Sequence, residues 1–209
     1  MTYYRESFPV GPLGCNCSII GDPVTKKAVV VDPGGDANII AEKLAAQGFT
    51  LSKIIHTHAH LDHFLASGDL KSRTGAPLYL HRADFPLWQN LETQCNLFQI
   101  PYNPVPDPDQ WLEDEMELGI ANGVCLHTPG HSPGSTSFWF DEINLLIAGD
   151  TLFRGSIGRT DLWGGDPDQI KRSIKDRLYR LDDDAVVITG HGPETSIGFE
   201  KRSNSFVTA

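Results

Sequence analysis

The sequence predicts an α/β protein in which two β-sheets pack together with helices on the outside. Strands and helices alternate along the middle of the chain, and runs of consecutive strands stand toward each end. Consecutive strands with short turns favour antiparallel pairing, which a doubly wound parallel sheet does not contain. The strands expected in these runs cover residues 3–10, 16–20, 28–31, 124–127, 135–140 and 144–148.

The intervening segments predict helices with recognisable ends. Asp36 is the expected N-cap of a helix over residues 37–47, with Gly48 just past its end, and Asp166 is the expected cap of a helix over residues 167–178. A further helix is expected from Asp62 to Arg73, stopped by Gly75. Single strands are expected over residues 51–55, 78–80 and 185–189. Residues 81–109 predict a helical stretch followed by irregular loop, and residues 199–209 predict no further element.

Composition bounds the function. The 209 residues, 40% hydrophobic and 21% charged, predict one domain over residues 1–209, with no apolar run long enough to span a membrane. The N-terminus has no signal-peptide or transit character, which predicts a cytoplasmic protein. A net charge of −10 disfavours nucleic acid and favours a small-molecule substrate. The four cysteines fit no zinc motif or disulfide framework, so reduced thiols are expected.

Residues 56–63, His-Thr-His-Ala-His-Leu-Asp-His, place four imidazoles and one carboxylate in eight positions. Such residues are common ligands of zinc and iron, which favours a metal site over a solvated histidine run. If the chain stays extended to His60, His58 and His60 point to the same side. His56 has the same parity, so spacing alone leaves open which two bind. Asp62 and His63 fall where a helix begins and can serve a second ion.

Three later segments have a shared form, in which an apolar strand ends and a His or Asp follows among glycines and small residues. Glycine permits close backbone approach, so strand ends of this kind can gather ligands from distant parts of the sequence. They offer His131, Asp150 and His191.

With these residues in order, the chain from about Asn16 to His191 resembles the metallo-β-lactamase superfamily, and within it the glyoxalase II group of thioester hydrolases. Residues 58–63 match its HxHxDH motif. The resemblance implies an αββα four-layer sandwich with two metal ions. One ion is held by His58, His60 and His131. The other is held by Asp62, His63 and His191, and Asp150 bridges both. Asp62 and Asp150 are then the expected catalytic residues.

The implied reaction is hydrolysis of acyl thioesters by a metal-bridged hydroxide, with S-D-lactoylglutathione giving D-lactate and glutathione. Zinc is the expected metal, and iron and manganese are alternatives. The chain looks most like a compact form without the C-terminal helical domain that contributes glutathione contacts. True β-lactamases of the superfamily usually have Cys where Asp150 stands, which disfavours antibiotic hydrolysis. Arg159 can contact an anionic substrate or pair with Asp161 or Asp166.

Two other readings stay open on the sequence. Persulfide dioxygenases resemble this chain in fold and in the Gly158–Asp161 segment, yet use a single iron held at the positions of His58, His131 and Asp150. A metal-binding or electron-transfer protein without catalysis is the third. The remaining histidines are expected to be structural or to orient ligands, namely His56, His81 and His127. The sequence does not give the oligomeric state.

Overall fold

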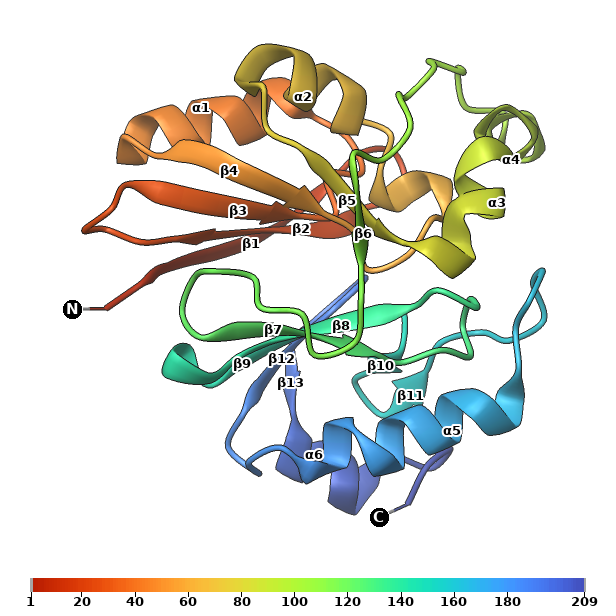
Figure 1. Ribbon diagram of the computed structural model, residues 1–209. Helices are drawn as coiled ribbons and strands as arrows, with labels where there is room; N and C mark the ends of the chain where they lie inside the picture. The colour runs from red at the N-terminus through yellow and green to blue at the C-terminus, as the bar shows by residue number, and fades with distance from the viewer. Residues whose placement is uncertain (1, 209) are drawn as a thin grey trace. The chain divides into compact units, whose positions relative to one another are not determined.

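The computed structural model describes residues 2–208, and the chain forms two compact units that divide between Leu112 and Glu113. Each unit consists of one main β-sheet and the helices that pack on it (Figure 1). Met1 and Ala209, which the one-domain prediction includes, lie outside the described residues. The expectation that residues 1–209 make a single domain stays a prediction.

The first unit contains a six-stranded mixed sheet in the order β1-β2-β3-β4-β5-β6. Its first three strands pair antiparallel, as predicted, and β3 to β6 pair parallel. The strands are β1 (Tyr4–Val10), β2 (Cys15–Gly21), β3 (Lys27–Val31), β4 (Thr50–Ile55), β5 (Leu78–His81) and β6 (Gln110–Leu112). The short strand β6 lies just past residues 81–109, where the sequence predicted no element.

Helices α1 and α2 lie on one face of this sheet, and Figure 1 shows both above it. The apolar face of α1 carries Ile40 and Leu44 into a core shared with the buried residues of β2, β3 and β4. The helical segments of this unit are α1 (Ala37–Gln47), η1 (Leu61–His63), α2 (Ser67–Thr74), η2 (Arg82–Asp84), α3 (Phe85–Gln89) and α4 (Leu91–Phe98). The predicted helical stretch after His81 is therefore confirmed.

The second unit contains a five-stranded sheet in the order β13-β12-β9-β8-β7 and a separate β10-β11 hairpin. Strands β7, β8 and β9 pair antiparallel, and β9 pairs parallel with β12. The strands are β7 (Gly123–His127), β8 (Thr136–Phe140), β9 (Leu145–Gly149), β10 (Leu152–Phe153), β11 (Ser156–Ile157), β12 (Val186–Thr189) and β13 (Thr195–Ser196).

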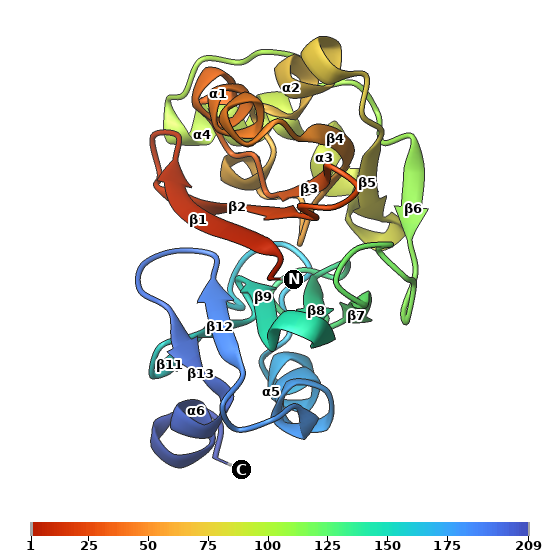
Figure 2. The ribbon, with the colours of Figure 1, turned by 90° about the vertical axis from the view of Figure 1, so that its left-hand side faces the viewer.

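Helices α5 (Pro167–Asp176) and α6 (Ile197–Ser203) lie on one face of the second sheet, as Figure 2 shows from the side. Ile170, Ile174 and Ile197 carry their apolar side chains into a core with Leu146 and Val187 of the strands. Asp166 caps α5 as predicted, because its side chain accepts hydrogen bonds from the backbone N–H groups of the first turn. The remaining helical turns of this unit are η3 (Asp141–Ile143) and η4 (Leu178–Arg180).

Three local predictions were wrong. Asp36 precedes α1, but its side chain does not cap that helix and instead accepts the N–H of Gly11 at 2.8 Å. The helix expected over residues 62–73 is split into η1 and α2 by residues 64–66. The C-terminal segment is not without structure, since α6 forms there and Val207 is buried against the core. Within residues 2–208, no helix is long and apolar enough to cross a membrane.

Candidate functional site

The histidine-rich segment of the first unit is a loop, so the condition of a strand extended to His60 is not met. Strand β4 ends at Ile55, and residues 56–60 have no regular structure. The imidazoles nevertheless converge: the rings of His58 and His60 have centroids 4.8 Å apart, and those of His58 and His63 are 4.0 Å apart. The 3-10 turn η1 redirects the chain, so that Asp62 Oδ2 lies 3.7 Å from His63 Nε2. The first unit therefore brings its four predicted ligands together.

Asp32, which no motif in the sequence singles out, orients two of these imidazoles. It is buried just after β3 with φ near +50°, and its carboxylate accepts the N–H of Thr57 at 2.7 Å and the Thr57 hydroxyl at 2.6 Å. The same carboxylate accepts Nδ1–H of His63 at 3.0 Å. Because the Thr57 hydroxyl donates to Asp32, its oxygen accepts Nδ1–H of His58 at 3.1 Å. Both rings thus keep Nε2 for a metal.

Other contacts hold the loop itself in place. Asp84 accepts the N–H of Ala59 at 3.0 Å, and Gln94 accepts the N–H of Leu61 at 2.9 Å. Gly34 is required for close approach, because a Cβ there would stand 1.5 Å from the carbonyl oxygen of Asp62. Asp84 and Gln94 lie in helical segments whose contact with this loop no local sequence pattern signals.

His56 has the structural role expected of it, which favours His58 and His60 as the two that bind. Its Nδ1–H donates to the Tyr79 carbonyl at 2.7 Å, and its Nε2 accepts the Ser67 hydroxyl at 2.7 Å. Both ring nitrogens are therefore used inside the protein. Burial lowers the pKa of His56 to about 4, so the ring is neutral at pH 7.

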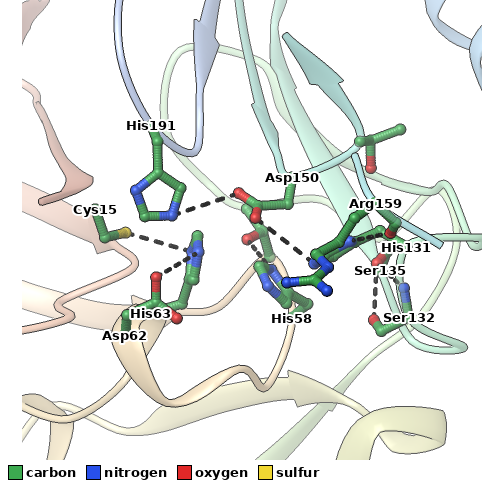
Figure 3. A network of polar contacts seen from close by, with 12 residues as sticks. Cys15, His58, Asp62, His63, His131, Ser132, Ser135, Asp150, Arg159 and His191 are labelled. Atoms are coloured by element: carbon green, nitrogen blue, oxygen red, sulfur yellow. Dashed lines mark hydrogen bonds and ion pairs between the residues drawn. The ribbon is translucent and has the colours of Figure 1, made fainter. Parts of the chain in front are cut away.

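In the second unit, His131 and His191 lie on the two sides of Asp150. His131 Nε2 is 3.6 Å from Asp150 Oδ2, and His191 Nε2 is 3.9 Å from Asp150 Oδ1 (Figure 3). Each carboxylate oxygen therefore faces a different imidazole. Glycine is required at position 190, because a Cβ there would lie 1.8 Å from Asp150 Oδ1. The second unit brings its three predicted ligands together.

The loop that carries His131 is anchored on both sides. Its Nδ1–H donates to the carbonyl of Arg159 at 2.8 Å, which again leaves Nε2 for a metal. Ser173 donates to the Pro129 carbonyl at 2.7 Å, and His127 Nε2 donates to the Pro133 carbonyl at 3.1 Å. His127 therefore has the structural role that was one of its two expectations, as an anchor of this loop.

The guanidinium of Arg159 forms an ion pair with Asp161, one of the partners expected from the sequence. It makes two 2.8 Å hydrogen bonds to the carboxylate of Asp161, and both side chains are more than half exposed. This pairing is the main reason that the pKa of Asp161 falls to about 2. The backbone carbonyl of Arg159 thus accepts the hydrogen bond from His131, while the Arg159 side chain is exposed to solvent.

The donor set fits divalent metal. Ligand atoms about 2.1 Å from one ion lie roughly 3.4 Å apart at a tetrahedral angle and farther apart at wider angles. The Nε2-to-carboxylate separations of 3.6, 3.7 and 3.9 Å are longer than ordinary hydrogen bonds and close to this spacing. Imidazole nitrogens with fixed Nε2 lone pairs and carboxylate oxygens suit zinc, iron and manganese.

A model of the metallo-beta-lactamase superfamily matches residues 10–191 of the chain. The chain belongs to this superfamily. The hydroxyacylglutathione hydrolase GloC of Haemophilus influenzae is 38% identical to it over 208 residues, which cover 98% of each protein. This membership confirms the predicted fold and makes the chain a member of a metallo-hydrolase superfamily whose His and Asp cluster implies divalent metal.

Solved structures of the superfamily show the same fold. The BLEG-1 B3 metallo-beta-lactamase is 36% identical with a TM-score of 0.90, covering 99% of this chain and 100% of that one. TTHA1623 in a di-iron-bound form is 35% identical with a TM-score of 0.90, covering 97% and 100%. ETHE1 from Myxococcus xanthus is 26% identical with a TM-score of 0.77, covering 98% and 84%.

Glu200 braces the hairpin that follows Asp150 in this metallo-beta-lactamase fold. It is fully buried, and its carboxylate accepts the N–H of Gly155 at 3.0 Å, the hydroxyl of Thr195 at 2.6 Å and the amide of Asn204 at 2.8 Å. Sequence reasoning missed it because the C-terminal segment was expected to carry no element.

Glu200→Ala is expected to lower the free energy of unfolding by about 3 kcal/mol, because one buried and two part-buried donors lose their buried acceptor. Urea denaturation measures the change. Glu142→Ala removes an exposed acid of the same unit and is expected to change it by less than about 0.5 kcal/mol. Equal losses in the two variants would show that Glu200 has no special role.

All four cysteines are buried free thiols, as expected. Burial raises the pKa of Cys125 to about 12 and that of Cys17 well above its ordinary value. Since the thiolate is the reactive form, a disulfide reagent at pH 8 is expected to modify none of the thiols in the folded protein and all four in guanidinium chloride. Rapid labelling of the native protein would contradict this.

Proposed function

We propose that the chain is a dinuclear metal-dependent thioester hydrolase in which the ligands of the two units bind a common pair of ions. One ion takes His58, His60 and His131, the other takes Asp62, His63 and His191, and Asp150 bridges them. The observation that carries the proposal is the placement of Asp150, whose two carboxylate oxygens face two different imidazoles. A carboxylate placed in this way suits two ions better than one.

Divalent ions held by these residues would supply Lewis-acid polarisation of a carbonyl and would lower the pKa of a bound water molecule. The chain's own residues do the rest. Asp62 turns one carboxylate oxygen toward His63, and its carboxylate would orient the attacking water and accept its proton. Water adds to the thioester carbonyl carbon, the carbon–sulfur bond breaks, and the sulfur takes up the proton, giving an acid and a thiol.

We take S-D-lactoylglutathione as the substrate, with D-lactate and glutathione as products, in keeping with the name of the Haemophilus influenzae relative. Zinc is the metal we propose, with iron and manganese as alternatives that the di-iron-bound relative supports. The proposed reaction requires only a small-molecule substrate, and neither a nucleic acid nor a membrane.

The resemblance in fold and in the Gly158–Asp161 segment supports a second candidate, the single-iron persulfide dioxygenase. A single-iron reaction would not use the second set of ligands, Asp62, His63 and His191. Asp62 and His63 are nevertheless held in place by contacts as close as those of His58. This arrangement favours the hydrolase.

The test is to assay one purified preparation, reconstituted separately with Zn²⁺, Fe²⁺ and Mn²⁺, against three substrates. We expect thiol release from S-D-lactoylglutathione, no oxygen uptake with glutathione persulfide, and little hydrolysis of a β-lactam such as nitrocefin. Oxygen uptake without thiol release would establish the dioxygenase. Nitrocefin turnover that exceeds thioester turnover would overturn the expectation against antibiotic hydrolysis.

A further inference from the structure

The Nε2 atom of His63 faces Asp62, and on the opposite side of the ring its Nδ1 atom lies near a buried cysteine as well as Asp32. Cys15 is fully buried at the start of β2, and its Sγ lies 3.4 Å from His63 Nδ1 (Figure 3). The same sulfur is 4.0 Å from the backbone carbonyl of Asp32, a distance at which a thiol can still donate weakly. The Nδ1–H of His63 therefore points between two acceptors, the Asp32 carboxylate at 3.0 Å and the Cys15 sulfur.

Cys15, Asp32 and His63 form a buried triad, and its geometry argues against a further metal ion there. Asp32 Oδ2 and His63 Nδ1 are 3.0 Å apart, a hydrogen-bond distance and shorter than the roughly 3.4 Å between two ligands of one zinc ion. Asp32 is also occupied by Thr57 on both of its oxygens. The triad therefore works as a hydrogen-bonded support behind a ligand.

We propose that Cys15 is a positioning residue for His63: by sharing the Nδ1 proton with Asp32 it fixes the plane of the imidazole, with Nε2 turned toward Asp62. One acceptor alone sets which nitrogen carries the proton but lets the ring swing about the hydrogen bond. A second acceptor on the other side of the N–H limits that swing. The inference rests on the proposed function only in that His63 must bind metal.

Cys17 is the matched control. It is fully buried on the same strand two residues later, so it lies on the same face of β2, but it packs in the hydrophobic core and no contact joins it to His63 in residues 2–208. Cys15→Ala and Cys17→Ala remove the same atom from neighbouring places. Cys15→Ser keeps a group that can accept the Nδ1 proton.

The experiment combines two readouts on the full chain. Chelator competition measures zinc affinity, and ¹⁵N spectra of histidine-labelled, metal-free protein follow the Nδ1–H of His63. We expect Cys15→Ala to weaken zinc binding about tenfold, in the range found for partners of metal-binding histidines. Its Nδ1 proton should exchange faster with solvent. Cys15→Ser should restore most of both properties, and Cys17→Ala should resemble the wild type.

Equal losses in Cys15→Ala and Cys17→Ala, or no loss in Cys15→Ala, would overturn the proposal. Failure of the proposed function would look different. A wild-type protein that binds no zinc would refute the metal site, and the exchange rate of the His63 proton in metal-free variants would still decide whether Cys15 holds the ring.

Discussion

Asp150→Asn is expected to abolish thioester hydrolysis and to lower metal affinity together. An amide has one oxygen and a nitrogen without a free lone pair, so it cannot face both His131 and His191 as the two carboxylate oxygens do. Loss of a ligand should cost more than the 10- to 100-fold typical of groups that only support a ligand, so we expect metal affinity and turnover each to fall by more than about 100-fold.

Asp161→Asn is the matched control for this change. It makes the same substitution in the same unit, on an exposed side chain that pairs with Arg159. Thioester turnover should stay within about threefold of the wild type, since exposed ion pairs contribute little. If Asp150→Asn kept turnover within the same threefold range, Asp150 would not be a bridging ligand.

Asp32→Ala is expected to have the largest effect on stability of any change outside the ligands. It leaves Thr57 with two donors and His63 with one donor that lose their acceptor in a buried place, at about 1 to 3 kcal/mol each. We therefore expect the free energy of unfolding of the metal-free protein to fall by more than about 3 kcal/mol. Urea denaturation with a chelator present measures this without a contribution from bound metal.

Asp36→Ala is the control that separates the effect of lost hydrogen bonds on stability from the effect of backbone strain. Asp36 has φ near +53°, as Asp32 has φ near +50°, so replacement by Ala strains both positions alike. Asp36 loses only one exposed hydrogen bond, with Gly11, and Asp36→Ala should cost about 1 kcal/mol. If Asp36→Ala were as destabilising as Asp32→Ala, strain and not the imidazole support would explain the loss.

The convergence of the candidate ligands within each unit could be predicted because these residues are signalled locally. His58, His60, Asp62 and His63 lie within six residues. Asp150 directly follows the end of β9, and His191 lies two residues after the end of β12, between two glycines. The strands were predictable for the same reason, since apolar runs between glycine and proline turns carry their own pattern.

The support behind the ligands could not be predicted in this way. Asp32 contacts His63 across 31 residues and Gln94 contacts Leu61 across 33, and both are residue types that usually lie in turns or on helix surfaces. Helix α6 was missed because its exposed face is polar, while only Ile197 and Gly198 at its start and Glu200 are buried. Such contacts appear only when the chain is folded.

The most direct test of the account is the metal content of three reconstituted proteins, measured by elemental analysis beside turnover of S-D-lactoylglutathione. The proteins are the wild type, His60→Ala from the first unit and His191→Ala from the second. We predict two metals per chain with prompt turnover in the wild type, and about one metal with turnover lowered more than about 100-fold in each variant. One metal per wild-type chain, unchanged by His191→Ala, would contradict a dinuclear centre built from both units.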